Sequence, residues 1–118
     1  MPYVLLVLVL LTAFVCSPAS AAPSPDVQAH LATGRAAFER GAFDRAIESW
    51  MLAATASEQA GERAGQILAL VHASEAHAAL GRYRQAVGVL DRALKLAEGS
   101  EERAHVPWIL SRLGNVLI

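Results

Sequence analysis

This chain of 118 residues contains little cysteine and few aromatic residues, and neither sign of charge is in clear excess. The only cysteine, Cys16, excludes an internal disulfide. Lysine and arginine together number 10, against 11 aspartate and glutamate residues, so the chain lacks the cationic excess of nucleic-acid-binding proteins. Aromatic residues make up 6%, which leaves few rings for stacking on bases. We therefore expect no nucleic-acid partner.

Proline is also missing from a long stretch, since none occurs between Pro25 and Pro107. This stretch shows no alternation typical of β-strands, and its apolar residues recur every three or four positions, which predicts helices. The expected helices span residues 27–40, 43–59, 62–80, 83–98 and 107–118. Asp26 is the expected N-cap of the first helix, and Gly41 and Gly61 are expected to end the first two. The predicted fold class is all-α, in one domain.

The N-terminal segment is the most apolar part of the chain. An apolar run over 4–15 is shorter than the roughly 20 residues that span a bilayer. Ala19 and Ala21 follow it in the small-x-small pattern of a cleavage site. We predict a signal peptide over residues 1–21, a linker over 22–26, and export of the cleaved protein to the periplasm or the medium.

Two other interpretations of the N-terminal segment remain open. No lysine or arginine precedes the apolar run, so an uncleaved transmembrane anchor is an alternative, and we expect membrane contact only in that case. A lipoprotein signal with Cys16 as the lipidated residue is the other. Val15 stands where such a signal carries a small residue.

A pattern of spaced residues occurs twice, 40 positions apart. The matching pairs are Gly41 and Gly81, Phe43 and Tyr83, Ala46 and Ala86, Ile47 and Val87, Trp50 and Leu90, and Ala53 and Ala93. A small residue also recurs three times at the same spacing, as Gly34, Ser74 and Gly114. Two helices approach closely only where side chains are small, and one large side chain then fills the remaining space. The pattern therefore predicts helical hairpins with alanine at the crossings.

With these residues the sequence resembles the tetratricopeptide repeat family. The shared features are the small residue of the first helix, the glycine and aromatic residue at the turn, and the alanines of the second helix. The resemblance implies a right-handed solenoid of antiparallel helix hairpins over 27–118. It has units at about 27–60 and 67–100 and a partial third unit at 107–118. The usual unit has about 34 residues, so we expect longer helices here. Units of 40 residues resemble those of exported bacterial repeat proteins, some of which precede a caspase-like CHAT peptidase domain.

Candidate catalytic or metal-binding residues are few. His72, Glu75 and His77 lie in the sequence HASEAH, which is similar to the zinc-protease motif with histidines four apart. Here the histidines are five apart, which turns them to different sides of a helix, so we expect no metal site. No serine lies in a glycine-flanked nucleophile elbow. We predict no catalytic site and no cofactor in this chain.

The resemblance implies a binding groove along the first helix of each unit. Its predicted lining residues are Gln28, Leu31, Arg35, Phe38, Leu68, Val71, Glu75, Ala79, Trp108, Ser111 and Asn115. The family's clamp for chaperone carboxylates is absent, because its positions hold Leu31, Arg35 and Glu75. The mixed groove suits an amphipathic helix or an extended peptide. Alternatively, the large apolar residues of this set pack between units. Val71 is predicted both as a groove residue and as a member of the inward apolar stripe of its helix.

We expect an exported scaffold that binds a protein or peptide in this groove. The alternative is the N-terminal repeat region of a larger enzyme, such as a CHAT-type peptidase, with its catalytic domain outside this chain. The last predicted helix carries an apolar stripe without a second helix to cover it. We expect Trp108 and Leu110 to dock this helix on the second hairpin. The exposed side should make the chain self-associate or fold only marginally unless residues beyond Ile118 cover it.

Overall fold

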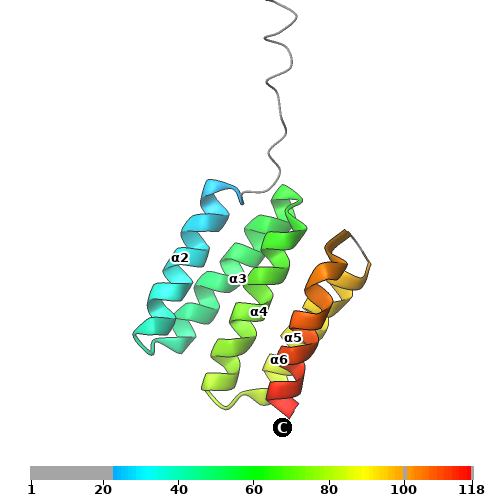
Figure 1. Ribbon diagram of the computed structural model, residues 1–118. Coiled ribbons are helices and arrows are strands. Elements are labelled where there is room, and N and C mark those ends of the chain that lie inside the picture. Colours follow the sequence, from blue (N-terminus) through cyan, green and yellow to red (C-terminus); the bar gives the residue numbers. More distant parts are fainter. Residues whose placement is uncertain (1–22, 100, 118) are drawn as a thin grey trace, which may run out of the picture.

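The computed structural model describes residues 23–99 and 101–117, and this part of the chain is all-helical (Figure 1). The elements are α2 (Pro25–Glu39), α3 (Phe43–Ala60), α4 (Arg63–Ala79), α5 (Tyr83–Glu98), the short 3-10 helix η2 (Glu101–His105) and α6 (Val106–Leu117). None of these residues lies in a strand, so the predicted all-α class is confirmed. No helix in these two ranges is long and apolar enough to cross a membrane. The predicted signal peptide lies outside the described residues.

The helices end close to where the sequence predicts. The expected and observed bounds of α3 differ by one residue at its end, those of α4 and α6 differ by one residue at both ends, and those of α5 agree. Gly41, Gly61 and Gly81 have φ values of 76°, 71° and 74° in the turns between helices. Glycine adopts this left-handed conformation without steric cost, so the chain reverses within two or three residues. We refer to α2 with α3 as the first hairpin and to α4 with α5 as the second.

The start of α2 differs from the prediction. The helix begins at Pro25, because proline at the first helical position needs no N–H partner and has a suitable φ. Ser24 rather than Asp26 therefore holds the N-cap position, and no side chain caps the helix. The backbone N–H of Ser24 donates to both carboxylate oxygens of Glu62, at 3.0 Å each. This contact fastens the chain before α2 to the residue just before α4.

The alanines predicted at helix crossings are buried. Ala46, Ala53, Ala86 and Ala93 are each 0% exposed. Ala46, Ala53 and Ala93 belong to clusters of buried residues drawn from several helices, and α2 contacts α3, α3 contacts α4, and α4 contacts α5. With no side chain beyond Cβ, alanine lets two helix backbones approach closely at these points.

Trp50 and Leu90 are the large buried side chains predicted for the two hairpins. The indole of Trp50 lies over Gly34, where an added Cβ would be 2.4 Å from its Nε1. Its Nε1–H donates to the backbone carbonyl of Leu31 at 3.2 Å. At Gly114 of α6, by contrast, an added Cβ would meet nothing within 4 Å. Of the two glycines in the repeated set Gly34, Ser74 and Gly114, only Gly34 thus has a close approach that requires glycine.

The first helices of the hairpins are neighbours. α2 contacts α4, and α4 contacts α6, so these three helices form one side of the fold (Figure 1). Two ion pairs join α3 to α5 and to the turn before it: Arg82 of the turn lies 3.0 Å from Asp44, and Arg92 of α5 lies 3.8 Å from Glu58. Exposed pairs of this kind contribute little to stability. The side formed by α2, α4 and α6 is the one that carries the predicted groove, and we call it the first-helix side.

The helix α6 docks on the second hairpin through Ile109 rather than through Leu110. Ile109 is 0% exposed and belongs to the core, whereas Leu110 is 51% exposed. Trp108 packs against this core as predicted. One residue corresponds to a rotation of about 100° on a helix, so this difference turns a different face inward. The expected uncovered apolar side is nevertheless present, since Leu117 is also 70% exposed.

A candidate binding pocket between α4 and α6

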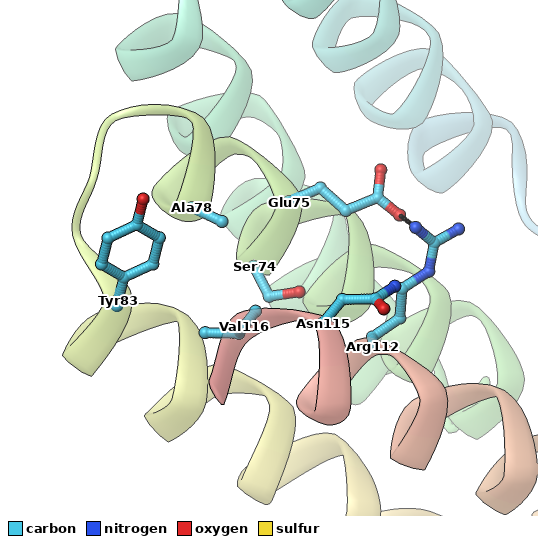
Figure 2. A pocket seen from close by; sticks show the side chains of 7 residues that line it. All are labelled: Ser74, Glu75, Ala78, Tyr83, Arg112, Asn115 and Val116. Carbon is cyan, nitrogen blue, oxygen red and sulfur yellow. Dashed lines mark ion pairs between the residues drawn. The ribbon is translucent and has the colours of Figure 1, made fainter. Parts of the chain in front are cut away.

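A pocket of about 270 Å³ lies between α4, the start of α5 and α6 (Figure 2). Its lining residues are Ser74, Glu75, Ala78, Tyr83, Arg112, Asn115 and Val116. Three come from α4, three from α6, and Tyr83 is the first residue of α5. Within each helix the lining residues are one, three or four positions apart, so they share one face. The pocket is therefore the space between two opposed helical faces.

The polar wall of the pocket is an ion pair. Nη1 of Arg112 lies 3.3 Å from Oε1 of Glu75, and Oε2 of Glu75 lies 3.9 Å from Nδ1 of His72 (Figure 2 shows the pair with Arg112). The neighbouring His72 imidazole lowers the pKa of Glu75, burial opposes this, and the positive charge of Arg112 lowers the pKa further. Glu75 is thus ionised at neutral pH, and Arg112 balances its charge.

The remaining lining is mostly apolar. Ala78 and Val116 face each other from α4 and α6, and the ring of Tyr83 stands at one end (Figure 2). Ser74 is 1% exposed, and its hydroxyl donates to the carbonyl of Val71 within the same helix. The pocket therefore offers an apolar surface with a neutralised ion pair on one side.

A row of rings extends from the first hairpin toward α6. Phe38 lies 5.1 Å from Phe43 and 5.7 Å from Trp50, measured between ring centroids. His72 stacks on Trp50 at 5.1 Å, and Trp108 lies 6.5 Å from His72. Trp108 thus contacts a ring of the second unit, which agrees with the alternative that the large groove residues pack between units, whereas the rings that Phe38 contacts belong to its own unit.

The predicted groove residues fall into three groups by exposure. The exposed ones are Gln28, Arg35, Ala79, Ser111 and Asn115. The half-buried ones are Leu31, Phe38, Leu68, Glu75 and Trp108. Val71 is 0% exposed and lies in the core, so its assignment to the groove is wrong. The cause is that α4 packs against helices on several sides, which leaves little of its surface open. Of the whole set, Glu75 and Asn115 line the same pocket.

The pocket itself was not predicted. Ser74 is predicted from the sequence as the recurring small residue of the first helix and Tyr83 as the aromatic residue at the turn, and Arg112 has no predicted role. One signal was present in the sequence: Ala78 stands 40 positions after Phe38, so a large residue of the first unit is replaced by a small one. Where one unit has a large side chain and the matching position of the next unit has a small one, unfilled space is expected beside the small residue.

The two histidines of HASEAH lie apart, as their spacing predicts. His72 contacts rings on the first-helix side, whereas Nδ1 of His77 is buried without a hydrogen-bond partner. Burial lowers the pKa of His77, and the positive charge of Arg82 adds to the effect. Within residues 23–99 and 101–117, no three His, Cys, Asp or Glu side chains are placed to hold a metal ion together.

Comparisons of the chain with protein-family models, with curated proteins and with solved structures found no match. What the pocket can bind therefore follows from its size and lining. Sites for small molecules usually have about 300–1,000 Å³. The volume of about 270 Å³ lies below that range and suits one side chain of a larger partner.

Proposed function

We propose that this protein is a scaffold of the tetratricopeptide type that binds a protein or peptide on its first-helix side. The observation that carries the proposal is the pocket between α4 and α6, which has an apolar lining and a neutralised ion pair. Grooves between helices bind amphipathic helices or extended peptides by taking up a few anchoring side chains. Exposed polar residues such as Arg35, Ser111 and Asn115 are available for the polar side of such a peptide.

The right-handed repeat array is part of this proposal. Its support is that Gly41 and Gly81, 40 positions apart, have nearly equal φ values of 76° and 74°. The buried alanines of the two hairpins follow the same spacing. In such an array the first-helix side is the extended binding surface. We also propose that the chain acts by binding rather than catalysis, since the Ser74 hydroxyl in the pocket is engaged by the Val71 carbonyl.

We further propose that the protein is exported after cleavage at Ala21, on the basis of the apolar run over 4–15 and the small residues that follow. N-terminal sequencing of the protein from the periplasm or the medium should then begin at Ala22. Recovery of intact Met1 in the membrane fraction would show an anchor instead.

Selection of peptides by display against the folded protein tests the binding function. Asn115→Trp places a large ring at the edge of the pocket, so it should weaken the binding of selected peptides by about tenfold or more. Gln85→Trp on α5 is the matched control, because it also enlarges an exposed amide residue but lies outside the pocket lining. Failure to select any peptide, or equal effects of the two substitutions, would contradict the proposal.

The uncovered side of α6 supports self-association. Leu110 and Leu117 are 51% and 70% exposed, and copies of the chain can bury them against each other. Sedimentation velocity should show a sedimentation coefficient that rises with concentration, and Leu110→Gln combined with Leu117→Gln should abolish the rise. Leu52→Gln on α3 is the control, since Leu52 is also 51% exposed. A wild-type protein that stays monomeric at every concentration would exclude this contact.

A further inference from the structure

The two hairpins differ at one large residue near the turn. Phe38 of α2 corresponds to Ala78 of α4, 40 positions later. The ring of Phe38 lies edge-to-face on Phe43 at 5.1 Å and lies 5.7 Å from Trp50. It also packs against the buried cluster that includes Ala76 of α4. In the first hairpin, the ring of Phe38 therefore fills the space near the turn.

In the second hairpin, the corresponding space near the turn is the pocket. Its lining residues Ala78 and Tyr83 stand 40 positions after Phe38 and Phe43. Val116, which lines it from α6, likewise stands 40 positions after Ala76, a member of the buried cluster that Phe38 packs against. The pocket thus keeps the counterparts of Phe43 and Ala76 without the ring of Phe38, whereas Leu90 stands where the first hairpin has Trp50.

Charge and ring geometry narrow the class of occupant. Glu75 and Arg112 neutralise each other at 3.3 Å, so a charged side chain entering the pocket would find no unpaired opposite charge there. Tyr83 is 57% exposed, so its ring has room for an edge-to-face contact like the one between Phe38 and Phe43. The guanidinium of Arg112 also attracts the face of an aromatic ring. These features favour a neutral aromatic side chain over an aliphatic or a charged one.

We propose that the pocket receives one uncharged aromatic side chain, of the phenylalanine type, from a segment of a partner protein. This rests on the proposed binding function and adds the chemical class of residue that the partner presents. Phe38 is the equivalent ring within the protein itself. We expect the partner's ring to lie between the faces of α4 and α6 in the way that Phe38 lies in the first hairpin.

An NMR titration of the full chain with N-acetyl-phenylalaninamide tests the assignment directly. With about 15 non-hydrogen atoms, this probe should bind with a Kd of ~1 mM. The amide signals of Ala78, Tyr83 and Asn115 should shift and saturate. N-acetyl-leucinamide should bind several-fold more weakly because it lacks the ring. Equal binding of the two probes, or shifts confined to other parts of the chain, would overturn the assignment.

Filling the pocket with a side chain of the protein provides the second test. Ala78→Phe restores the ring that the first hairpin has, so it should weaken probe binding by at least about tenfold and raise the melting temperature. Ala64→Phe on the same helix is the matched control, because Ala64 is exposed, does not line the pocket and is not one of the predicted groove residues. If Ala78→Phe does not fold, Val116→Phe fills the pocket from α6. Wild-type affinity in a folded, filled variant would refute the proposal.

Peptides selected by display separate this inference from the proposed function. Replacing the anchoring aromatic residue of a selected peptide by alanine should weaken binding by about ten- to a hundredfold. If the selected peptides bind the first-helix side but tolerate the loss of every aromatic residue, the aromatic assignment fails and the scaffold function stands. If no peptide is selected but the phenylalanine probe binds as described, the scaffold function fails and the ring preference of the pocket stands.

Discussion

Replacing Trp50 with alanine should lower the free energy of unfolding by about 3–5 kcal/mol. The indole is 3% exposed and fills the space between α2, α3 and α4, where it stacks on His72 at 5.1 Å. The substitution leaves a cavity and also removes the hydrogen bond from Nε1 to the carbonyl of Leu31. A small domain has only about 5–15 kcal/mol in total, so this is a large share. Urea unfolding followed by far-UV circular dichroism measures the change.

Two further variants control this prediction. Leu52→Ala on the same helix removes a side chain that is 51% exposed, and it should cost less than about 1 kcal/mol. Gly34→Ala should destabilise the wild-type protein, because the new Cβ would lie 2.4 Å from the indole. In the Trp50→Ala background that clash is absent, and the gain of up to about 1 kcal/mol in helix propensity remains. If Gly34→Ala has the same effect in both backgrounds, the close contact with Trp50 is not as described.

Enlarging Ala46 or Ala86 to leucine should cost about 1–3 kcal/mol in each case. Both alanines are 0% exposed, so the added methyl groups have to displace neighbouring helices. Thermal unfolding should show a lower melting temperature for each variant. Ala36→Leu is the control, since Ala36 lies on the exposed face of α2 and has room for the larger side chain. An unchanged melting temperature for both buried substitutions would show that these alanines are not the points of closest approach.

The parts of the fold that the sequence predicts depend on neighbouring residues. Gly61 and Gly81 mark helix ends because the left-handed conformation at those points is a local requirement. The buried alanines and Trp50 were predictable for a similar reason, because their spacing recurs along the chain. A repeated pattern predicts which residues of one helix face the other helix of the same hairpin.

The parts that the sequence does not predict depend on how helices from different hairpins meet. Val71 has the spacing of a groove residue, but α4 is covered on several sides and buries it. Ile109 rather than Leu110 docks α6, because the rotation of that helix is set by the surface beneath it. The pocket is marked in the sequence only by a small residue, Ala78, whose methyl side chain carries no chemical group that would indicate a site.

The way each helix packs mainly against the next one has a consequence for folding kinetics. Contacts between helices that are adjacent in the chain close short loops, so the entropy lost before they form is small and folding should be fast. The helix α4 touches α2, α3, α5 and α6, whereas α2 and α6 lie at the two ends. Partial opening should therefore begin at the end helices, and the backbone amides of α4 should be the last to exchange their hydrogens with solvent.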